Sequence, residues 1–348
     1  MVRIKKLKIN QVTRFFGIEN GGIGRYSQDL FNHFSKNKHN TIYRTECPGR
    51  SLQTYFLYSR LLLKYIHKKD CNLYHAMSPL ECIHLPKEKT VVTIHDLIPL
   101  LYQYKLNTFY KTNQFSNFIS QYAFYEGIKK AAECKKIICV SEETKENFIE
   151  VTNCNPKKVI VIDNHIQDKY QYLKPFKNYK QLTIGTISYL DDRKRIGDLI
   201  IAFKKIKDKN LHLFIGGFGP CKNKYIQMAK GDDRISFIGK IPEENMLFWY
   251  AAFDVFCSFS KAEGFNLPIV EAARVGRPVI TLKDAIIPKK IKDATIQINK
   301  NEFKKTINKL KNYKLRLKIG KKLTRWSRQF SPKKQLPKYE KAYREVWG

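Results

Sequence analysis

A short segment at residues 262–273 carries residue types suited to binding a phosphorylated ligand. It reads AEGFNLPIVEAA, with Glu263 and Glu271 at its two ends and Pro268 between them. Pro268 suits the first turn of a helix, and free N–H groups at a helix N-terminus bind phosphate oxygens. Glu271, one turn in, could accept hydrogen bonds from a vicinal diol such as a ribose. The alternative is an ordinary helix start whose acidic residues favour the helix dipole alone.

A cationic run could hold the same kind of ligand. Asp192-Arg193-Lys194-Arg195 precedes an expected helix near Gly197, and two cations beside a helix N-terminus make a good clamp for a diphosphate. A solvated turn is the alternative interpretation. Arg195 is expected mainly to cap the helix.

Two further segments follow expected strands. His95, in Thr93-Ile94-His95-Asp96, should point into the crevice at the carboxyl end of a sheet, with Asp96 able to orient it. The alternative is a histidine that makes structural hydrogen bonds. Gly22, in the run Gly21-Gly22-Ile23-Gly24, would let the backbone approach a phosphate or sugar, although a simple tight turn would also use these glycines.

Together these segments resemble retaining glycosyltransferases of the GT-B fold, family 4 (glycosyl transferases group 1). The segment at 263–272 is similar to the family's E-x7-E pattern, close to EGFGLPxxEA, with Asn266 where the family prefers glycine. Asn tolerates a left-handed backbone better than other non-glycine residues. Arg193 and Lys194 resemble the element that holds the donor diphosphate, Gly22 the N-terminal glycine loop, and His95 the histidine that contacts the donor sugar.

The resemblance implies a metal-independent transfer from a nucleotide-diphosphate sugar, UDP- or GDP-linked, without a cofactor. The leaving diphosphate must be stabilised as the sugar–oxygen bond breaks, and Glu263 is expected to position sugar hydroxyls rather than to act as nucleophile. The pairs Asp191-Asp192 and Asp232-Asp233 do not look like a metal cradle. The implied catalytic residues are Glu263, His95, Arg193 and Lys194, and the implied donor-binding residues are Gly22, Arg193, Lys194, Phe265, Asn266, Leu267 and Glu271.

The elements that must position these residues alternate along the chain. Short β-branched apolar runs alternate with segments of helical period, which predicts parallel sheets covered by helices. Predicted strands are 8–15, 72–76, 90–95, 136–140, 159–163, 182–187, 211–215, 235–238, 254–258 and 278–281, and predicted helices in the first half are 24–35, 52–67, 108–132 and 142–151.

Two domains are predicted. Residues 167–179 lose periodicity and are interpreted as a linker. The fold class is therefore α/β, with two Rossmann-like domains facing a cleft (GT-B) and C-terminal helices crossing back to the N-terminal domain. We predict an acceptor-side domain at 1–172, a nucleotide-sugar-binding domain at 173–328 and a returning C-terminal helix at 329–348.

The composition limits the classes of protein to which this chain can belong. The 348 residues include 65 Lys and Arg against 31 Asp and Glu, a net charge of +34, yet 43% are hydrophobic, which argues against disorder. Eight cysteines show no CxxC pair, so we expect reduced thiols and no structural zinc. No apolar run approaches the ~20 residues that span a bilayer. A cytoplasmic location, with peripheral contact at the inner membrane surface, is expected.

The charge is concentrated near the C-terminus. Residues 303–338 hold 14 Lys or Arg and no acid, and are expected to form a pair of helices with an apolar stripe and a basic face. This face is a candidate contact for an anionic membrane. The pI near 9.8 leaves a polyanion- or nucleic-acid-binding protein as the rival hypothesis, but no recognised module supports specific nucleic-acid binding. A sugar phosphorylase or epimerase on the same fold is a third alternative. The acceptor, whether glycan, lipid or protein, stays open.

Overall fold

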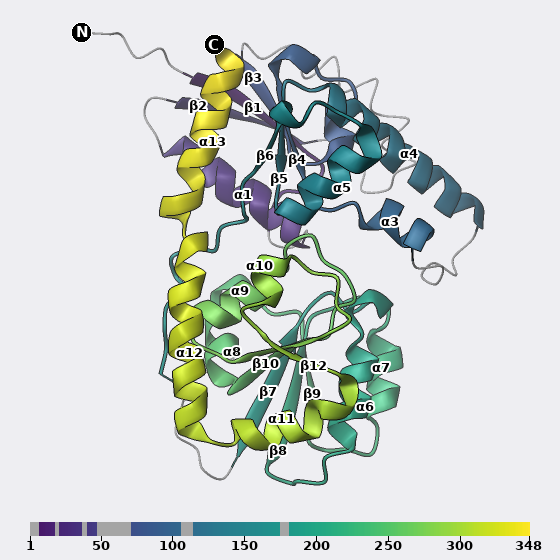
Figure 1. Cartoon of the computed structure of the whole chain (residues 1–348), viewed down its shortest axis with the longest axis vertical. Helices are drawn as coiled ribbons and strands as arrows, with labels where there is room; N and C mark the ends of the chain where they lie inside the picture. Colours follow the sequence, from purple (N-terminus) through teal and green to yellow (C-terminus); the bar gives the residue numbers. More distant parts are fainter. Residues whose placement is uncertain (1–6, 18–20, 37–39, 47–70, 106–113, 175–180) are drawn as a thin grey trace. The chain divides into compact units, whose positions relative to one another are not determined.

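The computed structural model describes residues 7–17, 21–36, 40–46, 71–105, 114–174 and 181–348. The chain divides into two compact units (Figure 1): unit 1 is Met1–Asn164 with Lys333–Gly348, and unit 2 is His165–Pro332. Within the described ranges each unit has one parallel six-stranded sheet, which confirms the α/β fold with two Rossmann-like domains. The division into compact units does not test the domain boundaries predicted at 1–172, 173–328 and 329–348, which stay predictions.

Unit 1 has the strand order β2-β1-β3-β4-β5-β6, with parallel pairing throughout. β4 illustrates why these segments become strands: its sequence TVVTI is β-branched and wholly buried, as in a sheet covered on both faces. The strands are β1 (Leu7–Thr13), β2 (Asn40–Glu46), β3 (Leu73–Ala76), β4 (Thr90–Ile94), β5 (Lys136–Cys139) and β6 (Val159–Val161). The helices are α1 (Gly21–Ser35), α3 (Ile98–Lys105), α4 (Gln114–Glu133), α5 (Glu142–Thr152) and α13 (Pro332–Trp347).

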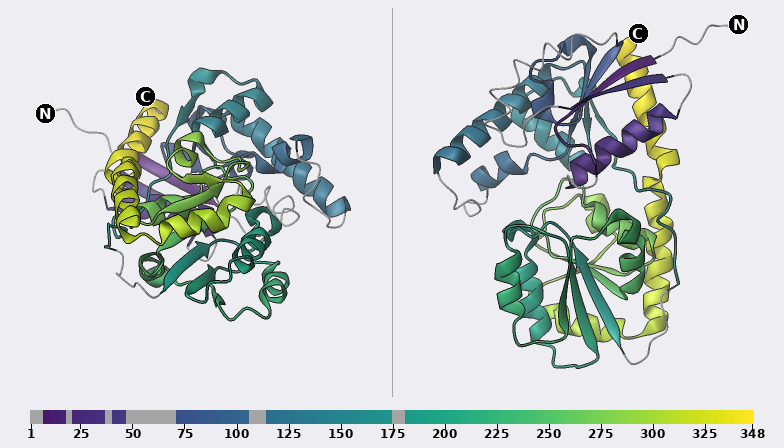
Figure 2. Two further views of the ribbon diagram at one scale, coloured as in Figure 1. Left: turned by 60° about the horizontal axis from the view of Figure 1, so that its bottom comes forward. Right: turned by 180° about the vertical axis from the view of Figure 1, so that it is seen from behind.

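Unit 2 has the order β12-β11-β10-β7-β8-β9, again parallel. In Figures 1 and 2, α6 and α7 cover one side of this sheet and α8, α9 and α12 the other. The strands are β7 (Leu182–Ile187), β8 (Leu211–Gly216), β9 (Ile235–Gly239), β10 (Val255–Ser258), β11 (Val279–Leu282) and β12 (Ile296–Ile298). The helices are α6 (Ile196–Lys204), α7 (Lys222–Ala229), α8 (Glu243–Ala252), α9 (Leu267–Arg274), α10 (Lys289–Lys292), α11 (Phe303–Leu310) and α12 (Tyr313–Ser327).

The order of the strands in unit 2 reverses between β7 and β10. These two strands are neighbours in the sheet although the chain passes through β8 and β9 between them. In open parallel sheets, ligands bind outside the carboxyl ends of the strands at such a reversal. This edge of unit 2 is therefore the place to look for a ligand site.

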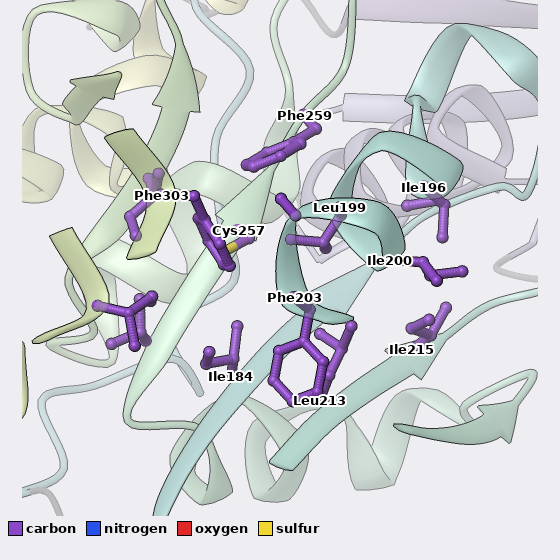
Figure 3. Packing of buried hydrophobic residues seen from close by; sticks show 14 of the residues in the cluster. Ile184, Ile196, Leu199, Ile200, Phe203, Leu213, Ile215, Cys257, Phe259 and Phe303 are labelled. Carbon is purple, nitrogen blue, oxygen red and sulfur yellow. The ribbon is translucent and has the colours of Figure 1, made fainter. Parts of the chain in front are cut away.

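The core that supports this edge lies between the sheet and α6. Figure 3 shows Leu199 and Phe203 of α6 against Ile184, Leu213 and Cys257 of three strands. All five side chains are buried, and burying a large apolar side chain stabilises by about 1.5–3 kcal/mol. Leu199 and Phe203 are four residues apart, a spacing that places both on one face of a helix.

The sequence analysis missed β2 and β12, which lie at sheet edges. β2 reads NTIYRTE and is partly exposed, so it lacks the continuous apolar run of a central strand. The predicted helix at 52–67 lies outside the described residues. Helix α1 begins at Gly21 rather than at residue 24, so the glycine run forms its first turn and not a separate loop.

The C-terminal helix α13 belongs to unit 1, which confirms the predicted return to the N-terminal domain. A chain of buried hydrogen bonds anchors it. The Tyr343 hydroxyl lies 2.7 Å from His75 Nδ1, His75 Nε2 lies 2.9 Å from Thr93 Oγ1, and that hydroxyl lies 2.8 Å from the Tyr26 hydroxyl. Burial lowers the pKa of His75 to about 3, so the ring is neutral in this chain. None of the described helices is long and apolar enough to cross a membrane.

Candidate active site

Two cations and one carboxylate meet at the strand reversal of unit 2. Arg193 and Lys194 lie in the turn that follows β7, and Glu263 lies in the loop that follows β10. Arg193 Nη1 donates to Glu263 Oε2 at 2.9 Å, and Lys194 Nζ contacts Glu263 Oε1. We call these three residues the Arg193–Lys194–Glu263 triad. Arg193 Nη2 also lies 3.8 Å from Asp191 Oδ2, so both cations are held in place by carboxylates at the edge where a ligand is expected.

Backbone hydrogen bonds hold the two loops together around the triad. Arg193 Nη1 also donates to the Ala262 carbonyl at 2.7 Å, and the Lys261 amide donates to the Arg193 carbonyl at 2.8 Å. The Glu263 amide donates to the Ile286 carbonyl at 2.9 Å. The position of the Glu263 carboxylate is therefore set by its own backbone as well as by the cations.

The triad strongly favours the ionised carboxylate. Burial by itself would raise the pKa of Glu263, but the charges of Lys194 and Arg193 outweigh it and lower the pKa to about 2. Glu263 is therefore a weak base at neutral pH. Its carboxylate is suited to hold cations and to accept hydrogen bonds, and poorly suited to remove a proton.

Arg195 occupies the N-cap position of helix α6, as predicted, and its carbonyl accepts from the Leu199 amide at 3.3 Å, but its side chain does not cap the helix. Arg195 has left-handed dihedrals at φ 50° and ψ 36°. Its guanidinium instead donates to the Phe259 carbonyl at 2.7 Å and to the Ser260 carbonyl at 3.3 Å, and pairs with Asp284 at 2.7 Å. Arg195 thus fastens the loop that carries Glu263, a role that a run of basic residues does not signal in sequence.

Asn266 occupies the left-handed conformation expected of it, with φ 76° and ψ 66°. Its side-chain amide donates to Ser258 Oγ at 3.0 Å. The next residue, Leu267, starts α9, and no described side chain caps that helix end. Phe265 is buried and packs edge-on against Phe330, with ring centroids 5.4 Å apart. Pro268 has no N–H and the Ile269 N–H donates to the Asn266 carbonyl at 3.2 Å, so the loop presents the Leu267 N–H at the start of α9.

Glu271 lies one turn further along α9 and is buried. The hydroxyl of Tyr250, from α8, donates to Glu271 Oε2 at 2.7 Å. Sequence reasoning missed Tyr250 because it ends the aromatic run Phe248-Trp249-Tyr250, which predicts packing rather than a polar role.

His95 and Gly22 belong to unit 1. His95 Nε2 lies 2.9 Å from the Met77 carbonyl, and the ring meets Tyr26 edge-on with centroids 4.8 Å apart. Burial lowers the pKa of His95 to about 4, so the ring is neutral at pH 7. With Nε2–H donating to the carbonyl, Nδ1 is the acceptor nitrogen. Gly22 is exposed in the first turn of α1, and a Cβ added there would meet no atom within 4 Å.

The paired aspartates contact their own turns or a lysine of α7. Asp191 accepts the Lys194 amide at 3.1 Å, and Asp192 pairs with Lys224 at 2.7 Å. Asp232 pairs with Arg234 at 2.6 Å. In the described part of the chain, no group of three His, Cys, Asp or Glu side chains has metal-site geometry.

Two family models match the chain and together cover most of it. Residues 180–312 match the family described as glycosyl transferases group 1, and residues 20–169 match glycosyltransferase family 4. One component of the human phosphatidylinositol N-acetylglucosaminyltransferase is 24% identical over 91% of this chain and 70% of its own length. The O-antigen chain mannosyltransferase RfbU of Salmonella typhimurium is 23% identical over 74% of this chain and 69% of its own. The gpi3 subunit of the phosphatidylinositol N-acetylglucosaminyltransferase of Schizosaccharomyces pombe is 29% identical over 45% of this chain, and the match covers only 36% of its own length.

Solved structures share the whole fold at low identity. Sucrose-phosphate synthase from Thermosynechococcus elongatus superposes with a TM-score of 0.78 and 16% identity, covering 98% of this chain and 99% of that one. WaaG, a glycosyltransferase involved in lipopolysaccharide biosynthesis, superposes with a TM-score of 0.75 and 13% identity, covering 98% of this chain and 100% of that one. Anabaena Alr3699/HepE in complex with UDP and glucose superposes with a TM-score of 0.71 and 15% identity, covering 96% of this chain and 98% of that one. The chain therefore belongs to glycosyltransferase family 4 and is a glycosyltransferase of the GT-B fold.

Proposed function

We propose that the protein transfers a hexosyl group from a nucleotide-diphosphate sugar, with retention of configuration and without a metal ion. The observation that carries this proposal is the Arg193–Lys194–Glu263 triad at the carboxyl edge of unit 2. Arg193 and Lys194 converge on one carboxylate there, so a diphosphate bound at this edge would meet two adjacent cations, and the Leu267 N–H starts α9 in the loop that carries Glu263.

In the proposed reaction, the bond between the anomeric carbon and the diphosphate oxygen breaks as negative charge grows on the diphosphate. Arg193 and Lys194 stabilise that charge, as does the backbone at Asn266 and Leu267. Such donors accelerate the reaction because they interact more strongly with the transition state than with the intact donor. Phe265 holds this loop in place through its buried ring, and Gly22 is proposed to lie close to the diphosphate.

Retention is proposed to follow a front-face route. The acceptor hydroxyl attacks the same face that the diphosphate leaves, and the departing phosphate oxygen takes the proton of that hydroxyl. Glu263 is not the nucleophile in this route, since Lys194 and Arg193 hold both of its oxygens. It is proposed to hold the cations and to accept hydrogen bonds from the sugar. His95 would accept a sugar hydroxyl at Nδ1, and Glu271 would bind the ribose.

The donor is proposed to be a UDP-sugar, with a GDP-sugar as the next candidate. Support comes from Alr3699/HepE, whose structures were solved with UDP and with UDP-glucose. The named relatives transfer N-acetylglucosamine or mannose, which supports a hexose as the transferred group.

The acceptor is proposed to be a glycan or a lipid, with a protein as a further candidate. One relative is named for phosphatidylinositol and another for the O-antigen chain. We further propose that the enzyme works in the cytoplasm, in peripheral contact with the inner membrane surface through the basic segment 303–338.

The proposal is tested by a donor screen. UDP-, GDP-, ADP- and TDP-sugars are offered to the protein, and binding is read by thermal shift and turnover by hydrolysis of the donor. We expect a UDP- or GDP-sugar to bind and to be hydrolysed slowly, equally with and without EDTA. Glu263→Ala should abolish turnover in a folded protein. Wild-type turnover in that variant, or no binding of any donor, would contradict the proposal.

A further inference from the structure

One face of α12 carries a row of exposed cations. Lys314, Lys318, Lys321, Lys322 and Arg325 are all exposed and follow one another at helical spacing. At 100° per residue they fall within a face about 100° wide, and the row is about 16 Å long at 1.5 Å per residue. We call these five residues the α12 row.

The positive charges of the α12 row are not neutralised by ion pairs with the described residues. α12 contains no Asp or Glu, and no member of the α12 row forms an ion pair with a described residue. Other basic residues of the same region behave differently: Lys311 pairs with Asp208 at 2.6 Å, and the buried Arg316 pairs with Asp254 at 3.0 Å. The α12 row is therefore a charged surface and not part of an ion-pair network of the fold.

The opposite face of α12 is fixed tightly to α9. An added Cβ at Gly320 would lie 2.2 Å from the Gly276 carbonyl oxygen, so the two backbones touch. The Thr324 hydroxyl lies 3.3 Å from the Ala273 carbonyl of α9. α9 is the helix whose first turn lies beside the Arg193–Lys194–Glu263 triad, so whatever binds the α12 row also orients the donor site of unit 2.

We propose that the α12 row docks unit 2 onto the surface of an anionic lipid bilayer. A straight row of lysines on a convex helix can approach a plane along its whole length. The surface potential of an anionic leaflet attracts such side chains within about one Debye length, ~8 Å at physiological ionic strength.

Nucleic acid fits this surface less well. Single-stranded nucleic acid is bound by grooves that combine cations with aromatic side chains on which the bases stack. The α12 row has one arginine and four lysines. The neighbouring Trp326 is half-buried and packs its ring on Phe330, with centroids 5.1 Å apart. Lysine acts as a point charge and lacks the planar fork of arginine, which suits a diffuse charged surface.

This inference rests on the proposed peripheral location of the enzyme and narrows the contact to five residues of one helix. The consequence is geometric. A bilayer bound along α12 holds α9 and the donor loop at a fixed orientation to the lipid surface, so that a membrane-anchored acceptor would be met in a defined direction.

The test is co-sedimentation of the whole protein with vesicles. Lys318, Lys321 and Lys322 are replaced together by Glu, which keeps helix propensity nearly unchanged. The matched control replaces Lys205, Lys207 and Lys209 by Glu, an equal change of charge at three exposed lysines beyond α6. Vesicles of phosphatidylcholine with 30% phosphatidylglycerol are compared with pure phosphatidylcholine, and UDP binding is measured separately by thermal shift.

We expect binding to the anionic vesicles alone, weakened more than about 100-fold by the α12 substitutions and less than about 5-fold by the control. Equal loss in both variants would reduce the effect to net charge and overturn the assignment to α12. Tighter binding of a 20-nucleotide RNA, lost with the same three lysines, would overturn it in favour of nucleic acid. Unchanged UDP binding in the α12 variant is expected. Failure of the wild-type protein to bind UDP would contradict the proposed donor while leaving the vesicle result to stand.

Discussion

Replacing Glu263 by Gln removes the charge of the triad while keeping the shape of the side chain. In the wild-type protein the carboxylate is held by Arg193 and Lys194, and its side chain is 11% exposed. In the variant, the two cations lose the carboxylate that lies between them, although Asp191 stays 3.8 Å from Arg193 Nη2. Removing one partner of a largely buried ion pair is strongly destabilising, because it leaves charge uncompensated.

The size of the effect follows from the pKa. A fall from 4.5 to about 2 corresponds to 2.5 pKa units, or about 3 kcal/mol at 1.36 kcal/mol per unit. Because Arg193 is 24% exposed, solvent screens part of this interaction, and we expect a loss of about 2–3 kcal/mol. In a unit of this size, 1 kcal/mol shifts the melting temperature by roughly 2–4 °C, so the variant should melt about 4–12 °C lower.

The lowered pKa of Glu263 also predicts how its contribution to stability changes with pH. The folded-state pKa of Glu263 is depressed, so its stabilising contribution is complete above pH 4.5 and is lost as the pH falls toward 2. The difference in melting temperature should therefore be constant between pH 7 and 5 and should shrink below pH 4.5.

Differential scanning calorimetry of the two proteins across this pH range is the assay. Glu244→Gln, at an exposed acid in the first turn of α8, is the matched control and should change stability by less than about 1 kcal/mol. A Glu263→Gln melting temperature within 1 °C of the wild type at pH 7 would show that the carboxylate does not stabilise the fold, and a difference that stays undiminished at pH 3 would show that its charge is not the cause.

Three other parts of the fold can be tested in the same way. Tyr343→Phe should destabilise unit 1 by about 1–3 kcal/mol, because it leaves His75 Nδ1 without its partner. Tyr339→Phe should cost less, under about 1 kcal/mol, because the Tyr26 hydroxyl that it meets keeps its bond to Thr93; equal effects in urea unfolding would contradict this. Gly320→Ala should lower the stability of unit 2 by about 1–3 kcal/mol, since the new methyl group would overlap the Gly276 carbonyl; a melting temperature equal to that of the wild type would show that α12 can shift. The stability of unit 1 should fall as the pH decreases from 6.5 toward 3, since the unfolded chain protonates His75 and His95 and the folded chain keeps both neutral over most of this range; a flat profile in chemical denaturation would argue against buried neutral rings.

Much of the fold was predictable because its central strands carry an unambiguous signal. β7, β8 and β10 are apolar runs covered on both faces, and α6 shows its buried face in the spacing of Leu199 and Phe203. The edge strand β2 was missed because its sequence NTIYRTE is mixed and mostly only partly buried, and β12 was missed because its three residues are too few to show a period. The edge strands β6 and β9, which carry apolar runs, were predicted, so local pattern identifies strands by their apolar run and loses those that lack one.

The site was predictable in its residue types and less so in its contacts. The pattern around Glu263 and the cations at 193 and 194 pointed to one ligand, but not to the ion pairs that join them across 69 residues of chain. The role of Arg195 depends on its left-handed backbone, which turns the side chain toward the loop at Phe259. Such a direction follows from tertiary packing and cannot be derived from the type of residue.

The cations of unit 2 are proposed to hold the donor diphosphate, and titration calorimetry with UDP measures that interaction without any acceptor. Arg193→Ala with Lys194→Ala should weaken UDP binding by about 100-fold or more, since two charge-assisted contacts are each worth about 1.5–3 kcal/mol. Lys222→Ala, at an exposed lysine on α7, should leave the affinity unchanged. An unaltered UDP affinity in the double variant would mean that Arg193 and Lys194 do not bind the diphosphate.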